Sequence, residues 1–345
     1  MSLHSEIFEQ PVCLERLLKS QRKTVNSIAQ AIRSQDIKFA FLAARGTSDN
    51  AGRYANYLWG AMNGLPLALA TPSLFTYYKR PPRLKNALVV GISQSGQSPD
   101  IVSVLEEGRR QGNLTLAITN NVDSPLAQIA DFVLYIEAGQ EKAVAATKTY
   151  TTELLAIAML STALEEDNIR WGELERVSGW VSEALHQEDA VQQAAQRYRY
   201  MEQCVVLGRG YNYATAFEWA LKLKELTYVE AEPYSSADFQ HGPVAMVARG
   251  FPVMAVAPEG KVLDSMLKLL THLQDDLLAE LVVISNTPRA LDMAQVPFTI
   301  PEDVPEWLSP LVSIVPAQLF SYHLTLAKGY DADQPRSIKK VTETQ

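Results

Sequence analysis

The chain has little of several features that would each point to a particular class of protein. Its 345 residues include only two cysteines, Cys13 and Cys204, which lie far apart and match no metal-ligand spacing. The net charge is −8, and no cluster of lysines or arginines provides the concentrated basic face that binding to a nucleic-acid backbone requires. No window approaches the run of about 18 apolar residues expected of a membrane helix.

These absences predict a cytoplasmic protein that binds neither nucleic acid nor membrane. The first residues, MSLHSEIFEQP, lack the apolar core of a signal peptide, and the scarcity of cysteine fits a reducing cytosol. Neither a Walker A lysine loop nor a GxGxxG motif is present, so the sequence predicts no nucleotide, no other cofactor and no metal. Apolar residues make up 47% of the chain, which is enough for two domains with separate cores.

The sequence contains an internal duplication. Four short apolar runs in the first half, FAFLAARG, ALVVGIS, LTLAITN and FVLYIE, match CVVLGRG, PVMAVAP, ELVVISN and PFTIPE in the second half. Corresponding positions in each pair are about 165 residues apart. The runs are rich in valine, isoleucine and leucine and are nearly continuous, which is typical of parallel strands that are covered on both faces.

Helical patterns lie between these runs. Ser98, Pro99 and Asp100 form a helix start before 101–111, and long amphipathic stretches at 147–164 and 310–328 occupy matching places in the two halves. The alternation predicts an α/β fold of two tandem, doubly wound and mainly parallel sheets. We expect an N-terminal helical segment at 1–34, a first domain at 35–165, a helical linker at 166–197, a second domain at 198–328 and a C-terminal tail at 329–345.

Hydroxyl side chains follow two strands of the first half. RGTS at 45–48 follows the first predicted strand, and SQSGQS at 93–98 follows the second and leads into a helix. Ligands in open α/β sheets bind beyond the carboxyl ends of strands, and a helix start binds anions. Serines also cap helices and form turns in every protein, but two such loops at successive strand ends favour a phosphate site. APEG at 257–260 of the second half lacks hydroxyls, so we expect one phosphate site per chain.

A second candidate site lies in the stretch 216–243, AFEWALKLKELTYVEAEPYSSADFQHGP. Glu218, Lys222 and Glu225 are spaced by four and three residues, so one helix face presents all three side chains. His241 follows in a turn-like QHGP sequence. An isolated helix with this pattern is usually a solvent-exposed ladder of ion pairs. Together with the hydroxyl loops of the first half, however, these groups favour proton transfer on a small polar substrate.

Taken together, these segments resemble the sugar isomerase (SIS) domain family, and in particular the isomerase domain of the glucosamine-6-phosphate synthases. The resemblance covers nearly the whole chain. It rests on RGTS at 45–48, SQSGQSPD at 93–100, AVAATKTYTTEL at 143–154, LGRG at 207–210, ALKLKELTY at 220–228, QHGP at 240–243 and DQPRSIKK at 333–340. It implies a doubly wound fold that binds phosphosugars and forms a homodimer.

The resemblance also implies roles for individual residues. Glu225 matches the base that moves a proton between C1 and C2, and Lys222 matches the lysine beside it. His241 matches a ring-opening histidine that a neighbouring subunit lends. Lys340 matches a tail lysine that forms a Schiff base, although the tail by itself has no periodicity. The positions that match substrate-binding residues are Thr47, Ser48, Ser93, Gln94, Ser95, Ser98 and Val144.

The sequence departs from the synthases in two respects. The printed chain begins Met1-Ser2 without a glutaminase segment, and Arg45 and Ala146 replace residues that are usual in the synthases. We therefore expect an enzyme that converts glucosamine 6-phosphate to fructose 6-phosphate and ammonia without hydrolysing glutamine. The alternatives are a deglycase of fructosamine 6-phosphates such as fructoselysine 6-phosphate, a pure phosphosugar isomerase, which would not need Lys340, and a non-catalytic phosphosugar sensor.

Overall fold

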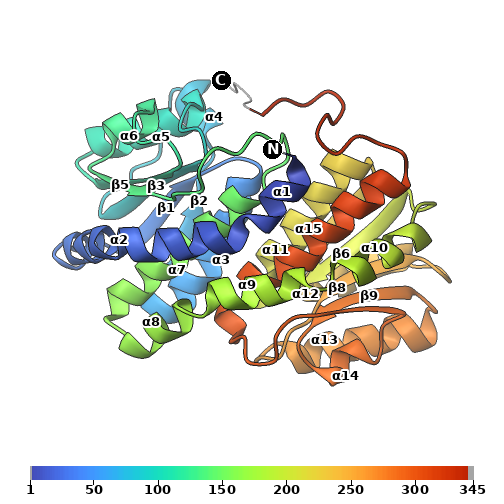
Figure 1. Cartoon of the computed structure of the whole chain (residues 1–345). Coiled ribbons are helices and arrows are strands. Elements are labelled where there is room, and N and C mark those ends of the chain that lie inside the picture. Colours follow the sequence, from blue (N-terminus) through green and yellow to red (C-terminus); the bar gives the residue numbers. More distant parts are fainter. Residues whose placement is uncertain (1, 341–345) are drawn as a thin grey trace. The chain divides into compact units, whose positions relative to one another are not determined.

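The computed structural model describes residues 2–340, which contain two five-stranded sheets flanked by helices (Figure 1). By their internal contacts these residues divide into two units. The first-sheet unit comprises 12–141, 148–176 and the described residues from 339 onward, and the second-sheet unit comprises 2–11, 142–147 and 177–338. Each unit is described by itself, and the domain boundaries expected from the sequence stay a prediction.

The first-sheet unit has strand order β2-β1-β3-β4-β5, with every neighbouring pair parallel. Its elements are α2 (Gln10–Arg33), β1 (Phe39–Ala43), α3 (Thr47–Asn63), β2 (Leu67–Leu69), α4 (Ser73–Thr76), β3 (Ala87–Ser93), α5 (Pro99–Arg110), β4 (Leu114–Thr119), α6 (Pro125–Ile129), β5 (Phe132–Tyr135), α7 (Lys148–Glu165) and α8 (Asn168–Leu174). All seven residues of β3 are buried, which explains why this strand is apolar without alternation.

The second-sheet unit has strand order β10-β9-β8-β6-β7, again with parallel pairs throughout. Its elements are α1 (Leu3–Phe8), α9 (Val177–Leu185), α10 (Glu188–Arg197), β6 (Gln203–Gly208), α11 (Tyr213–Lys222), β7 (Glu230–Ser235), α12 (Ser236–Gln240), β8 (Pro252–Val256), α13 (Leu263–Thr271), β9 (Glu280–Ser285), α14 (Pro288–Leu291), β10 (Val296–Thr299) and α15 (Ser309–Ala327). Three 3-10 helices, Gly210–Asn212, Pro243–Met246 and Glu306–Leu308, and two π-helical segments, Leu223–Thr227 and His272–Asp276, complete this part.

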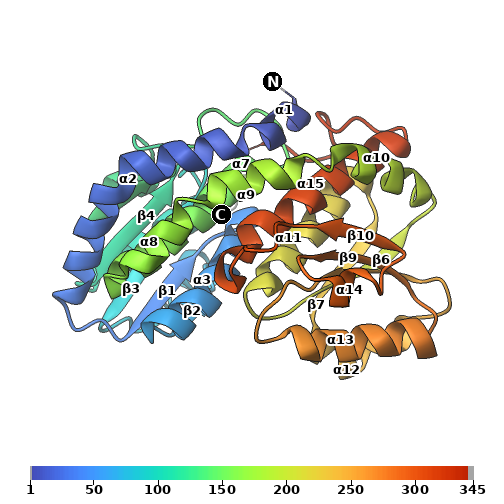
Figure 2. The same ribbon diagram turned by 60° about the horizontal axis from the view of Figure 1, so that its bottom comes forward.

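The two sheets share one topology. When β6 to β10 are matched with β1 to β5 in chain order, the strand orders are the same. In the second-sheet unit α13 and α14 cover one face of the sheet, and α11 and α15 contact the sheet as well (Figure 2). This arrangement confirms the predicted α/β fold of two parallel sheets related by duplication, because each apolar run of the sequence forms a strand.

One strand of each sheet was not predicted from the sequence. β2 is three residues long and only partly buried, and β7 has the sequence EAEPYS with both glutamates exposed. Both lie at a sheet edge, where a strand needs no continuous apolar run and tolerates a proline such as Pro233. Their strand conformation follows from pairing with β1 and β6, which local sequence does not reveal.

The two stretches predicted to be amphipathic helices are helices, but they are not amphipathic. In α7 every residue from Lys148 to Ala163 is buried, and most of α15 is buried as well. A helix that is covered on all sides loses its polar face, which is why the prediction of amphipathic character was wrong. Among residues 2–340, no helix combines the length and the apolar character that crossing a bilayer demands.

We expect Gly108→Ala to destabilise the first-sheet unit. A Cβ atom at position 108 of α5 would lie 2.7 Å from Val89 Cγ2 and 2.9 Å from Val89 Cβ, which belong to a buried strand. The overlap should lower the free energy of unfolding by about 1–3 kcal/mol, measured by urea denaturation. The control is Gly60→Ala on α3, where a Cβ atom meets nothing within 4 Å and helix propensity should raise stability by up to about 1 kcal/mol. Equal effects of the two changes would contradict this account.

Candidate active site

The SQSGQS turn at 93–98 joins β3 to α5 in the first-sheet unit. Ser93 Oγ accepts a hydrogen bond from the Gly96 N–H at 3.1 Å, and Ser95 Oγ accepts one from the Gln97 N–H at 3.3 Å. The backbone of Gly96 has φ +63°, and a Cβ atom there would lie 2.1 Å from the Ser124 hydroxyl. Only glycine fits this position, so the turn has a defined shape. Gln94 in this turn is half-buried.

Ser98 is the N-cap residue of α5, but its hydroxyl makes no capping hydrogen bond. At the start of α6 in the same unit, Ser124 does cap its helix by accepting a hydrogen bond from the Ala127 N–H at 3.3 Å. The start of α5 therefore keeps the Ser98 hydroxyl for an anion, whereas Pro99 has no N–H and the Ile101 N–H is already hydrogen-bonded. This helix start also follows β3, which pairs with β1. The strand order changes direction between these two strands, and such a topological switch point is where ligands bind in open α/β sheets.

The other predicted sugar contacts lie near the starts of two helices. Thr47 is the first residue of α3, and the next residue, Ser48, is buried and donates a hydrogen bond from Oγ to Glu153 Oε1 of α7 at 2.8 Å. Val144 is half-buried in the loop between β5 and α7, in the part of this loop, 142–147, that belongs to the second-sheet unit. The structure thus brings Thr47 and Ser48 into the same unit as the 93–98 turn, whereas Val144 belongs to the other unit.

The predicted acid–base helix is present in the second-sheet unit. Lys222 Nζ lies 3.3 Å from Glu218 Oε1 and 2.6 Å from Glu225 Oε2. The exposed fractions of the three side chains differ: Glu218 is 0% exposed, Lys222 is 1% exposed and Glu225 is 24% exposed. Burial by itself would lower the pKa of Lys222, but the two carboxylates outweigh it and hold this pKa above its ordinary value. Lys222 is therefore a permanent ammonium, and Glu225 is the member of the trio that a substrate can reach.

Lys222 and Glu225 lie on helical segments of different type. α11 ends at Lys222, and the chain continues as a π-helix from Leu223 to Thr227 that ends at Tyr228, whose φ is +59°. π-helical turns are rare and occur frequently at functional sites. The spacing of three between Lys222 and Glu225 predicted that the pair lies on one face, and the ion pair shows that the wider turn preserves this. The sequence did not reveal the π-helix.

The structure places His241 apart from these contacts. His241 is the C-cap residue of α12 and is exposed, and its backbone N–H donates a hydrogen bond to the Asp238 carbonyl at 3.0 Å. Position 242 has φ +140°, which favours the glycine found there, so the QHGP turn has a defined shape. An exposed imidazole at such a turn is accessible to a ligand. The role of His241 stays a prediction.

Lys340 is held by a carboxylate that sequence reasoning missed. Lys340 Nζ donates a hydrogen bond to Glu141 Oε2 at 2.5 Å, within the first-sheet unit. The Glu141 side chain is fully buried, and it also accepts hydrogen bonds from the Thr149 N–H at 3.1 Å and the Thr149 hydroxyl at 2.7 Å. Thr149 is the second residue of α7, so Glu141 is an anion held at a helix start. The only signal in the sequence that could have pointed to Glu141 is its position just before the AVAATK segment.

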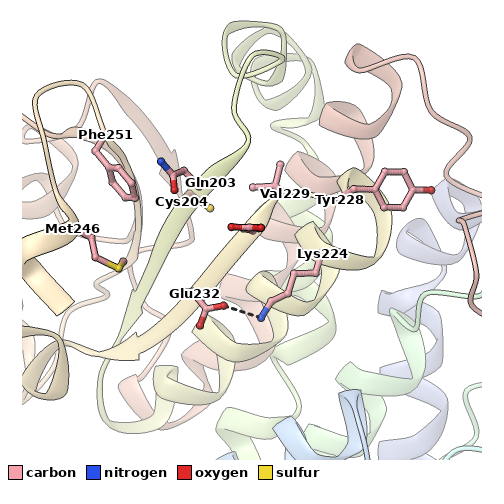
Figure 3. A pocket seen from close by; sticks show the side chains of 9 residues that line it. Gln203, Cys204, Lys224, Tyr228, Val229, Glu232, Met246 and Phe251 are labelled. Atoms are coloured by element: carbon pink, nitrogen blue, oxygen red, sulfur yellow. Dashed lines mark ion pairs between the residues drawn. The ribbon is translucent and has the colours of Figure 1, made fainter.

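One cavity, lined in part by the π-helical segment Leu223–Thr227, does not contain the predicted site residues. It has a volume of about 450 Å³ and is lined by Gln203, Cys204, Lys224, Tyr228, Val229, Glu230, Glu232, Met246 and Phe251 (Figure 3). Gln203 and Glu230 are the first residues of β6 and β7, so this cavity lies at the amino ends of the strands. Ligands of open α/β sheets bind at the other end, so we do not assign the substrate to this cavity.

Comparison with known proteins gives a family match over two segments of the chain. The family model described as the SIS domain matches residues 35–163 and 199–328. The glutamine–fructose-6-phosphate aminotransferase (isomerizing) of Thermococcus kodakarensis is 35% identical over 346 residues, which cover 97% of this chain and 56% of that protein. The chain thus spans little more than half the length of the curated relatives that it matches.

Solved structures give the same picture. A protein from Silicibacter pomeroyi DSS-3, provisionally described as a phosphosugar isomerase, is 33% identical with a TM-score of 0.88, and the match covers 96% of this chain and 100% of that chain. The C-terminal domain of glucosamine-fructose-6-phosphate aminotransferase from Francisella tularensis is 28% identical with a TM-score of 0.84, covering 96% and 98%.

We expect Glu218→Gln to destabilise the protein strongly. The change removes one of the two carboxylates that face a buried ammonium, and breaking a buried pair costs about 3–5 kcal/mol. The free energy of unfolding, measured by urea denaturation, should fall by at least half of that cost. Asp264→Asn is the control, because the Arg289–Asp264 pair is exposed and screened by solvent, so its loss should leave stability nearly unchanged. A Glu218→Gln variant as stable as the control would show that Lys222 does not need its buried partner.

Proposed function

Because the chain belongs to the SIS domain family, we propose that it is a phosphosugar isomerase that converts glucosamine 6-phosphate and water to fructose 6-phosphate and ammonia. One observation carries this proposal. A buried ammonium, Lys222, contacts a carboxylate, Glu225, that is partly exposed. This combination suits the transfer of a proton between neighbouring carbon atoms of a sugar.

The isomerisation step needs one group that removes a proton and returns it. In the proposed reaction Glu225 removes the proton from C2 of the open-chain aldose and delivers it to C1. Negative charge develops on the C1 oxygen as the C–H bond breaks, and the ammonium of Lys222 stabilises it. Glu218 has no exposed surface, so its role is to balance the charge of Lys222. We assign to the exposed His241 the proton transfer that opens the sugar ring.

Release of the amine needs a nucleophile, and Lys340 supplies one. The isomerised sugar carries an imine at C2; the neutral amine of Lys340 adds to C2, ammonia leaves, and a Schiff base to Nζ remains. Water then hydrolyses the Schiff base to the ketone and the free lysine, so the net reaction consumes one water and releases one ammonia. Lys340 must first lose a proton, and Glu141 Oε2, at 2.5 Å, is the acceptor beside it.

The phosphate anchors the substrate in this proposal. Thr47, Ser93, Gln94, Ser95 and Ser98 are assigned to the phosphate group, and Ser48 and Val144 to the sugar chain. The hydroxyl of Ser98 supports the assignment, because it lies at the start of α5 and makes no capping hydrogen bond.

We expect the purified chain to release ammonia and fructose 6-phosphate in equal amounts from glucosamine 6-phosphate. Glu225→Gln should lower kcat by roughly 10²–10⁴, because a neutral amide cannot accept the C2 proton. The variant should still be stabilised against heat by the sugar phosphate, since the phosphate contacts are unchanged. Coupled enzymatic assays of both products give the rates.

Other results would lead elsewhere. Cleavage of fructoselysine 6-phosphate without deamination of glucosamine 6-phosphate would make the protein a deglycase. Formation of glucosamine 6-phosphate from fructose 6-phosphate and ammonia, with no measurable reverse reaction, would assign it the synthetic direction. Phosphosugar binding without any turnover would contradict the enzymatic proposal, and full activity of Glu225→Gln would contradict the role of that residue.

We expect borohydride to trap a covalent adduct on Lys340 in the presence of fructose 6-phosphate. Reduction of the Schiff base makes the bond permanent, and mass spectrometry of the tail peptide then locates it. Lys340→Arg keeps the positive charge that faces Glu141 but cannot form an imine, so it should give no adduct and should lose deamination. An adduct on Lys222, or an unchanged adduct in the variant, would refute the assignment.

A further inference from the structure

An arginine stands beside the proposed phosphate turn and is held there by a buried acid. Arg45 follows β1, and its Nε donates a hydrogen bond to Asp100 Oδ2 at 2.7 Å. The Arg45 side chain is 51% exposed, whereas the Asp100 side chain is only 1% exposed. The guanidinium group therefore reaches solvent while its inner edge is fixed to the protein.

Asp100 is itself fixed at the start of α5. It is the second residue of that helix, two positions after the N-cap Ser98, and its Oδ1 accepts a hydrogen bond from its neighbour, the Ile101 N–H, at 2.9 Å. The ion pair thus attaches Arg45 to the same helix turn that presents the unused Ser98 hydroxyl. The bond uses Nε, and no other residue of the described part of the chain accepts a hydrogen bond from the terminal amino groups of Arg45. Both amino groups are therefore left for a ligand.

The charges around Arg45 nearly cancel. Asp49 of α3 pairs with Arg53 at 3.2 Å. Burial raises the pKa of Asp49, and the charges of Arg53 and Arg45 act against that rise. The charges of these two arginines and two aspartates balance, so the two acids do not leave a net negative charge that would repel a phosphate. Without Arg45 the same surroundings would carry one net negative charge, which disfavours a phosphate.

We propose that Arg45 binds the phosphate of the substrate directly through its terminal amino groups, and that Asp100 is the positioning residue that orients it. A guanidinium offers a planar fork of donors that matches two oxygens of a phosphate, and a fork fixed at one edge loses little freedom on binding. The site therefore selects a sugar with a terminal phosphate over the same sugar without it. This inference rests on the phosphate site of the proposed function.

A simpler role for Arg45 has to be separated from this one. Arg45 could act only by neutralising the buried carboxylate of Asp100, without touching a ligand. Asp100→Asn distinguishes the two roles, because asparagine keeps the size of the side chain and removes the charge that would need neutralising. The Asn side-chain oxygen can still accept the hydrogen bond from the Ile101 N–H.

The experiment measures dissociation constants of glucosamine 6-phosphate and of inorganic phosphate by calorimetry. Arg45→Ala should weaken both ligands at least tenfold, and Arg45→Lys should have an intermediate effect, because lysine keeps the charge but not the fork. Asp100→Asn should change affinity less than Arg45→Ala does. The double variant Arg45→Ala/Asp100→Asn should stay at least tenfold weaker than Asp100→Asn alone. Arg110→Ala is the matched control, since it removes an ion-paired arginine at the far end of α5 and should leave affinity unchanged.

Two results would overturn the proposal. One is a double variant that binds both ligands as well as the wild type, which would reduce Arg45 to a neutralising role. The other is an Arg45→Ala variant that unfolds at the wild-type temperature and keeps wild-type affinity. Inorganic phosphate is not turned over, and glucosamine 6-phosphate is titrated with every variant in the Glu225→Gln background, so the outcome is independent of the reaction. A protein that binds glucosamine 6-phosphate through Arg45 but never deaminates it with Glu225 in place would refute only the proposed function.

Discussion

Lys222 keeps its positive charge where solvent reaches only 1% of its side chain, and this is possible because carboxylates face it on two sides. A lone buried ammonium would give up its proton, so the charge exists only together with Glu218 and Glu225. The two acids have different roles in this arrangement. Glu218 is enclosed and fixes the lysine, whereas Glu225 is partly exposed and is the group that a sugar can reach. The proposed chemistry depends on this inequality of exposure.

A buried acid also lies beneath three other candidate groups. Asp100 lies under Arg45, Glu141 under Lys340 and Glu153 under Ser48, and each of these acids is buried. A buried carboxylate with good hydrogen bonds is rigid, so it fixes the direction of the group that it binds. The outer group then loses little freedom when a ligand arrives, which favours a site that binds small and highly polar molecules.

Duplication supplied two sheets of the same topology, but their loops have diverged. The turn after β3 carries several hydroxyls, including that of Ser98, which makes no capping hydrogen bond, whereas the corresponding APEG segment after β8 has none. A Cβ atom on Gly260 would lie 2.2 Å from Glu306 Cδ, so a carboxylate side chain already packs against that turn. A phosphate would meet negative charge there, in keeping with the expectation of a single phosphate site. The acid–base groups instead belong to the second-sheet unit, on α11 and the π-helical segment that continues it.

The sequence by itself determined which segments become strands of a buried sheet, because covered parallel strands must be apolar on both faces. It also determined that Glu218, Lys222 and Glu225 share a helix face, since spacings of four and three allow little else. It could not reveal β2 and β7, whose conformation comes from pairing at a sheet edge, nor the absence of a polar face on α7 and α15. Only the tertiary structure decided which acid is buried beneath which functional group. Glu141 and Lys340 are about 200 residues apart in the chain, and no local pattern links residues that only folding brings within a hydrogen bond.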